Sequence, residues 1–143
     1  MKIVAICGGG GKTTLATKYP DKFVDIDQFV WDDHNKKYHA SILESIDKRD
    51  YDKLGSIYKN IYLNSYNYFK NLNKIILVHH PENARWLKSE CVLLLKPSKE
   101  LFAQNISYRS KILKDVSLNS WDNLDNAIIF NSHKELEEIV LKI

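Results

Sequence analysis

Short apolar runs alternate along this chain with longer stretches in which apolar and polar residues are mixed. Residues 75–78 and 92–95 are apolar at every position, as a strand must be when helices cover both faces of its sheet. These two runs therefore predict interior strands. The full set of predicted strands is residues 2–6, 23–27, 74–79, 91–95 and 127–130.

Helices are predicted between the strands, at residues 12–18, 41–50, 53–71, 98–109 and 132–143. The last of them begins with a capping box, because Ser132 can cap it and Glu135 follows three residues later. Strands that alternate with helices favour βαβ units, a parallel sheet and right-handed crossovers. We therefore predict one α/β domain over residues 1–143, with a helical lobe in the long connection at residues 28–72.

Four consecutive glycines follow the first predicted strand and lead directly into the first predicted helix. Glycines let successive backbone N–H groups turn toward phosphate oxygens, and a helix N-terminus adds a partial positive charge. In such a loop Lys12 reaches the β- and γ-phosphates, and the hydroxyl of Thr13 completes the coordination of Mg²⁺. The sequence thus predicts a site for ATP, or another nucleoside triphosphate, with Mg²⁺. The predicted phosphate-binding residues are Gly8, Gly9, Gly10, Gly11, Lys12, Thr13 and Thr14.

The loop departs from the pattern G-x-x-x-x-G-K-[ST] at its first position. Ile6 stands where the pattern has a glycine. Either Ile6 replaces that glycine, or the loop is one residue short and Cys7 takes the place.

On this loop the chain resembles the small P-loop kinases of the P-loop NTPase superfamily, the group that contains adenylate kinase, shikimate kinase and gluconate kinase. The resemblance runs along nearly the whole chain, but only the glycine loop is specific. It implies a three-layer fold in which helices flank a five-stranded parallel sheet, with an acceptor-binding lobe at about residues 28–72 and a short lid at about residues 105–126. It also implies ATP- and Mg²⁺-dependent phosphoryl transfer to a small acceptor, with nucleoside monophosphates slightly ahead of sugar-like alcohols.

Two aspartates end the second predicted strand. The two-residue period of a strand puts Asp25 and Asp27 on the same side, and the carboxyl edge of a parallel sheet is where ligands gather. This D-x-D ending resembles the one in shikimate-type kinases. The resemblance implies that Asp27 orients or deprotonates an acceptor hydroxyl and that Asp25 holds a Mg²⁺-bound water. The alternative for each is a solvated acid at the end of a strand.

The third predicted strand lacks the acid that many P-loop proteins carry at its end to support Mg²⁺. It runs instead into His79, His80 and Pro81. We expect one of the two histidines to line the cleft, where a neutral imidazole can accept a hydrogen bond but brings no negative charge. The missing acid keeps a second hypothesis open, namely a nucleotide-binding or protein-interaction protein with little or no catalysis.

Arginines are rare in this chain, and guanidinium groups are the preferred clamps for phosphate. The resemblance assigns Arg85 to the acceptor phosphate and Arg109 to the lid, where it would contact the transferred phosphoryl group. Asn105 lies one turn before Arg109 on the same face, where the group carries a second lid arginine. Arg49 is a further candidate for acceptor phosphate, without a family motif. For each arginine the alternative is a surface position.

Three tyrosines of the middle lobe, Tyr58, Tyr62 and Tyr66, share one face of a predicted helix. Their spacing is typical of a packing stripe. The alternative is that they stack on a ring of the acceptor.

Composition narrows the range of partners to a nucleotide and a small molecule, with a protein partner left open. A net charge of +3, from 21 basic and 18 acidic residues without a basic block, argues against nucleic acid and so against a polynucleotide 5′-kinase, although an NTPase remains an alternative. No apolar stretch approaches the ~20 residues that span a bilayer. Two cysteines in apolar runs and an N-terminus that begins directly with a strand favour a cytoplasmic protein without a signal peptide.

Overall fold

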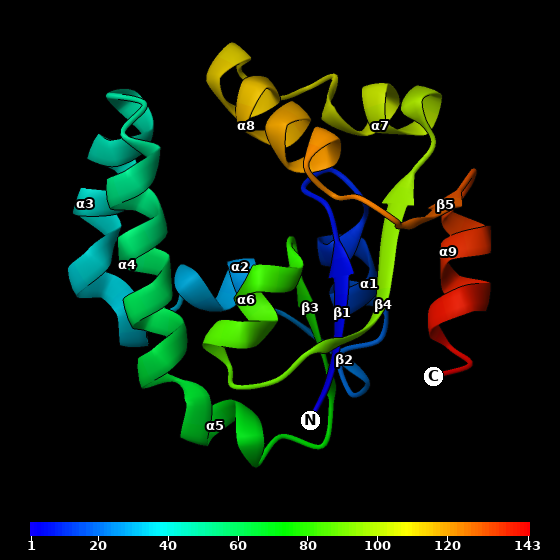
Figure 1. Ribbon diagram of the computed structural model, residues 1–143, viewed down its shortest axis with the longest axis horizontal. Helices are drawn as coiled ribbons and strands as arrows, with labels where there is room; N and C mark the ends of the chain where they lie inside the picture. The colour runs from blue at the N-terminus through cyan, green and yellow to red at the C-terminus, as the bar shows by residue number, and fades with distance from the viewer.

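Five parallel strands form a single sheet through the middle of the molecule (Figure 1). The computed structural model describes residues 1–143, and the strands follow the spatial order β2-β3-β1-β4-β5. Helices lie on both sides of the sheet, so the predicted α/β fold class with a five-stranded parallel sheet flanked by helices is confirmed. The strands are β1 (Lys2–Ile6), β2 (Phe23–Asp25), β3 (Ile75–Val78), β4 (Cys91–Pro97) and β5 (Ile128–Phe130).

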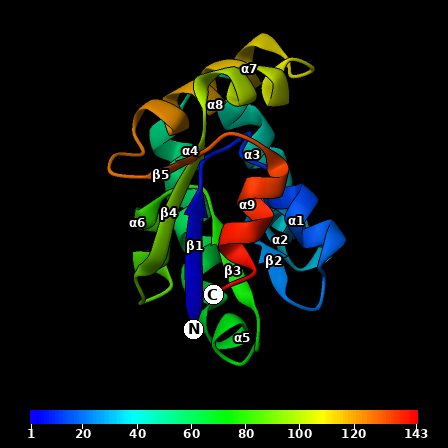
Figure 2. The same ribbon diagram turned by 90° about the vertical axis from the view of Figure 1, so that its right-hand side faces the viewer.

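The helices divide into those that cover the sheet and those that extend beyond its carboxyl end. Figures 1 and 2 show α7 and α8 beyond the carboxyl ends of the strands, while both chain termini lie at the opposite end. None of the helices combines the length and the apolar character needed to cross a bilayer. The helices are α1 (Lys12–Lys18), α2 (Ile26–Val30), η1 (Asp33–Asn35), α3 (Lys36–Asp47), α4 (Tyr51–Asn64), α5 (Tyr66–Lys70), α6 (Pro81–Trp86), α7 (Lys99–Ile106), α8 (Lys111–Asp122) and α9 (His133–Val140).

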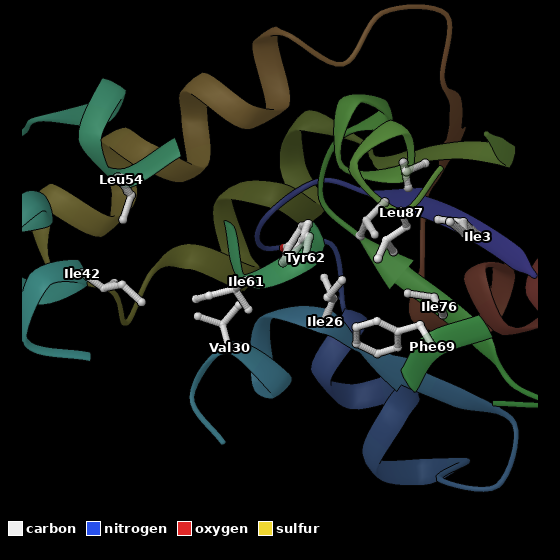
Figure 3. Close-up of a cluster of buried hydrophobic side chains, with 13 residues drawn as sticks. Ile3, Ile26, Val30, Ile42, Leu54, Ile61, Tyr62, Phe69, Ile76 and Leu87 are labelled. Atoms are coloured by element: carbon white, nitrogen blue, oxygen red, sulfur yellow. The ribbon is translucent and has the colours of Figure 1, made fainter. Parts of the chain in front are cut away.

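Alternation along β1 divides the core into two layers. Ile3 and Ala5 face a cluster made with residues of α2, α3, α4 and α6, whereas Val4 and Ile6 face a cluster made with α1 and α9. Successive strand residues point to opposite faces, so one buried strand contributes to both layers. Figure 3 shows the first cluster, in which side chains from the strands and from the helical lobe point toward one another.

Several predicted boundaries differ from the structure, and three of the differences are explained by local contacts. The second strand ends at Asp25 instead of Asp27, because the Asp25 carboxylate caps α2 by accepting a hydrogen bond from the backbone of Asp27 (3.0 Å). The predicted helix at residues 53–71 is two helices that meet at Ser65, whose hydroxyl bonds back to the carbonyl of Ile61 (2.6 Å) and competes with the helical ladder.

The third difference concerns the lid. Residues 105–126 contain a twelve-residue helix, α8, that the sequence analysis did not predict. It begins where the Ser110 hydroxyl accepts a hydrogen bond from the backbone of Leu113, so its start signal was present in the sequence. The predicted cap of α9 by Ser132 is confirmed, since its hydroxyl accepts from the backbone of Glu135 (3.1 Å).

Replacing Ile76 by alanine tests the packing of the first cluster. Ile76 lies on β3 and is fully buried, so Ile76→Ala should lower the free energy of unfolding by about 2–5 kcal/mol. The matched control is Ile129→Ala on β5, where half of the side chain is exposed and a loss of about half that size or less is expected. Urea unfolding measures both. Similar losses in the two variants would contradict the assigned core.

Candidate functional site

The carboxyl ends of the parallel strands bring the glycine loop to one edge of the sheet. Residues 7–11 connect β1 to α1, and Gly9 and Gly11 have φ angles of 83° and 100°, in the left-handed region. Gly10 leaves no room for a side chain, because a Cβ there would lie 2.4 Å from Cγ2 of Ile6 and 2.8 Å from the carbonyl oxygen of Cys7. Ile6, at the first position of the motif, is the buried last residue of β1.

Lys12 places a buried ammonium group at this loop. Only 6% of Lys12 is exposed, and its Nζ donates to the carbonyl oxygen of Ile6 (3.1 Å) and lies 3.5 Å from Oδ2 of Asp27. An ammonium group has three donors, and a charge this buried requires partners of this kind. The loop, the end of β1 and the start of α2 are therefore joined through one cation.

Thr13 and Asp25 meet beside Lys12. The Thr13 hydroxyl donates to Oδ2 of Asp25 at 2.9 Å, and Asp25 is 2% exposed. Burial raises the pKa of Asp25 above its ordinary value, and the negative charge of Asp27 adds to the effect. A hydroxyl and a carboxylate supply the oxygen ligands that Mg²⁺ takes, and such a cation obtains its remaining ligands from phosphates and water. These two residues fit a Mg²⁺ ion that is bound together with a nucleotide.

Asp27 lies between the ammonium group of Lys12 and the imidazole ring of His79. Its Oδ1 is 3.4 Å from Nδ1 of His79, in addition to the contact of Oδ2 with Lys12. Burial alone would raise the pKa of Asp27, but Lys12 and His79 outweigh it and hold that pKa well below the ordinary value. Asp27 is therefore an ionised carboxylate at neutral pH, in the first turn of α2 instead of on a strand.

His79, not His80, belongs to the site. It follows β3 directly and is partly buried against Asp27, whereas the ring of His80 accepts a hydrogen bond from the backbone of Glu82 and caps α6. The residue that follows the third strand thus contacts an acid in the first turn of α2, the helix that follows the neighbouring strand β2. The sequence signalled a histidine in the cleft but not which one, since that depends on the packing of α6.

The lid segment contacts the glycine loop through Ser120 and places Arg109 and Ser117 beside Gly8. The guanidinium of Arg109 donates to the hydroxyl of Ser117, and a Cβ built on Gly8 would lie 3.9 Å from Nη1 of Arg109. The backbone N–H of Gly8 lies 3.3 Å from the hydroxyl oxygen of Ser120 and donates to it. Helix α8 is therefore fastened to the loop by Ser120 and holds Arg109 beside the loop through Ser117. Neither serine carries a recognisable motif in the sequence.

Asn105 occupies the position where the resemblance implies a second lid arginine. Instead of a phosphate contact, it makes a hydrogen bond to the glycine loop. Its side-chain amide donates to the carbonyl oxygen of Gly9 (2.8 Å), and its Oδ1 lies 3.2 Å from Nε2 of His133. Phe102 and Ile106 of α7 pack against the same glycine. Asn105 thus fixes the backbone of the loop, and His133, at the start of α9, is a neighbour that sequence reasoning missed.

A cleft of ≈ 1140 Å³ opens from the loop between the helical lobe and α8. Figure 1 shows α3 and α4 on one side and α8 facing them. Gly8, Asp27 and His79 lie at the end of the cleft next to the glycine loop, and Arg109 lies in its wall. The cleft therefore gives a small molecule access to the groups that surround Lys12.

The structure gathers some of the predicted site residues and leaves others outside. Lys12, Thr13, Asp25, Asp27 and Arg109 come together around the glycine loop. Of the predicted site residues, Gly8, Asp27 and Arg109 line the cleft itself. Three others make none of these contacts. Thr14 is exposed on α1, Arg49 is exposed in the turn between α3 and α4 with φ 54°, and Arg85 is exposed on α6.

No known family model and no curated protein matches this chain. The functional argument therefore depends on the fold and on the contacts described above.

Asp27→Asn should change how stability depends on pH. Because the folded-state pKa of Asp27 is lowered, its carboxylate stabilises the fold above the ordinary aspartate pKa of about 3.9, and this contribution is lost as the pH falls through the folded-state value. The variant should be less stable than the wild type at neutral pH and should lose less on acidification. Urea midpoints at neutral and acidic pH measure this.

Asp21→Asn, at an exposed position, is the matched control and should behave as the wild type does. Equal sensitivity to acid in the wild type and in Asp27→Asn would show that Lys12 and His79 do not hold the carboxylate ionised.

Proposed function

We propose that the protein is a phosphotransferase that moves the γ-phosphoryl group of ATP, or of another nucleoside triphosphate, to a small acceptor bound in the cleft. The observation that carries the proposal is the position of Lys12. Its buried ammonium lies at a glycine loop at the start of a helix, beside the ionised Asp27, which lines the cleft. Such a loop suits phosphate groups, and the cleft suits an acceptor.

The donor side of the proposed site uses the loop and the first turn of α1. The backbone N–H groups of Gly9, Gly11 and Lys12 would bind phosphate oxygens, whereas those of Gly8 and Gly10 already donate to the Ser120 hydroxyl and to the carbonyl of Cys7. Lys12 would neutralise charge on the β- and γ-phosphates. Thr13 and Asp25 would hold Mg²⁺, which neutralises charge as the phosphoryl group moves. Asp25 thus supplies the carboxylate that is missing after β3, from the adjacent strand β2.

Transfer also requires a proton acceptor and a lid charge. If the acceptor is an alcohol, its oxygen forms the new bond to phosphorus as the bond to the β,γ-bridging oxygen breaks. The bridging electron pair leaves with the nucleoside diphosphate, and Asp27 accepts the hydroxyl proton. Arg109 would contact the equatorial oxygens of the phosphoryl group in the transition state of the transfer.

A nucleotide-binding protein without transfer is the second candidate, with NTP hydrolysis as its catalytic variant. Two observations favour it: His79 stands where an acid would follow β3, and Asn105 is bonded to the loop where a second lid arginine would stand. This candidate requires nucleotide binding but no dependence of turnover on an acceptor.

Lys12→Ala tests nucleotide binding. Removing the ammonium should weaken binding of ATP–Mg²⁺ by more than about tenfold, since the β- and γ-phosphates lose their cation. Calorimetry on folded protein measures this. The control is Lys18→Ala, which removes an exposed lysine of the same helix that pairs with Glu137 and should leave ATP affinity unchanged. Wild-type protein that binds no nucleotide would contradict the proposal.

Arg109→Lys separates transfer from binding. The variant keeps the positive charge but loses the two-pronged donor, so turnover should fall by about 10²-fold or more while ATP affinity changes little. Arg85→Lys is the control, because Arg85 lies outside the cleft. Coupled turnover assays over alcohols and nucleoside monophosphates measure both variants. Wild-type turnover in Arg109→Lys would remove Arg109 from the reaction.

A further inference from the structure

The walls of the cleft are apolar and aromatic where the acceptor would lie. The lobe contributes Trp31, Leu54 and Tyr58, and α8 contributes Leu113 and Val116. Flat apolar surfaces of this kind bind rings and other apolar bodies. The polar groups of the acceptor therefore have their partners at the end of the cleft next to the glycine loop.

Five of the thirteen exposed large apolar side chains line the cleft, and three of these five are aromatic. Trp31 is 42% exposed and Tyr51 48% exposed on the lobe side, and Tyr108 is 81% exposed on the lid side. All three line the cleft. Single exposed apolar residues are ordinary on a protein surface, but their convergence in one concave site indicates an apolar ligand.

The charges of the cleft do not suit an acceptor phosphate. Asp27 and the α3 residues Glu44 and Asp47 are acidic, and Arg109 is the one arginine in the lining. Arg109 lies next to Gly8, at the end where the transferred group would pass. A phosphate monoester carries about −1.5 to −2 charges at neutral pH. In the outer cleft it would face Asp47 and also Glu44, whose charge is partly offset by Lys48 at 2.7 Å, without an arginine.

The groups at the end of the cleft suit a hydroxyl. Asp27 is held between Lys12 and His79, and the ring of Tyr58 stands edge-on to His79 with 6.4 Å between ring centroids. A ring bound along Tyr58 would therefore bring a substituent close to the carboxylate. This arrangement combines an apolar wall with a proton acceptor next to the phosphate loop.

Building on the proposed function, we infer that the acceptor is an uncharged alcohol with a flat apolar body, of the nucleoside type, and not a nucleoside monophosphate. This departs from the preference that the resemblance implied, because Arg85 and Arg49 lie outside the cleft. The wall around Tyr58 selects the ring, and Asp27 takes the hydroxyl proton. Asp47 repels phosphate, and Glu44, which pairs with Lys48, adds a smaller repulsion.

Matched pairs of ligands test the inference. Adenosine, guanosine, cytidine, thymidine and 2-phenylethanol are each compared with their own phosphate monoester by calorimetry, with wild-type protein, Mg²⁺ and a non-hydrolysable ATP analogue. At least one alcohol should bind about tenfold or more tightly than its ester. Preference for the esters, or no binding by any member, overturns the inference.

Two variants show whether the named walls are responsible. Tyr58→Ala should weaken the preferred alcohol by about tenfold or more, whereas Tyr68→Ala, an exposed tyrosine of α5 outside the cleft, should not. Glu44→Gln combined with Asp47→Asn should reduce the ratio between the affinity for the alcohol and the affinity for its ester. If the two tyrosine variants weaken binding equally, or if the affinity ratio of alcohol to ester does not change, the roles given to these lining residues are wrong.

Titration with the ATP analogue alone, without any acceptor, distinguishes failure of the proposed function from failure of this inference. Failure of the ATP analogue to bind without any acceptor contradicts the proposed function itself. Binding of the analogue together with a preference for phosphate esters overturns only the acceptor class.

Discussion

The buried ammonium of Lys12 is the constraint on which the rest of the site depends. Taking a cation out of water costs several kcal/mol unless it is paired and hydrogen-bonded, and Lys12 is 6% exposed. Its two partners, the Ile6 carbonyl and the Asp27 carboxylate, come from the end of β1 and the start of α2. The glycine loop and Asp27 are therefore joined through one buried cation, and removing the Asp27 carboxylate would leave the Lys12 charge with the Ile6 carbonyl as its remaining partner.

Two aspartates that are two residues apart have opposite protonation behaviour because their partners differ. Asp25 is almost fully buried, so desolvation raises its pKa, although Thr13 donates a hydrogen bond to it. For Asp27 the effect of Lys12 and His79 exceeds that of burial, and its pKa is lowered. The two neighbouring acids therefore differ at neutral pH: the lowered pKa keeps Asp27 ionised, so it can accept hydrogen bonds, whereas burial disfavours the charged form of Asp25.

The lid shows how distant segments produce one surface. Helix α8 faces α3 and α4 across the cleft (Figure 1), and Ser120 fastens it to the backbone of Gly8. The lobe and the lid contribute apolar side chains that are more than fifty residues apart in the chain, such as Leu54 and Leu113. The same helix also positions Arg109 through Ser117, so the wall of the cleft and the lid charge depend on one element.

The sequence by itself determined the strands of the sheet and the place of the loop, because apolar runs and the Gly8–Thr14 pattern act over a few neighbouring residues. It also indicated Asp25 and Asp27 as a pair, although they meet the loop through a helix cap and not through strand alternation. Only the tertiary structure decided that His79 contacts Asp27, that Arg85 lies outside the cleft, and that the cleft is apolar. The physical reason is that these facts depend on how separate elements pack against one another, and local periodicity carries no information about such distances.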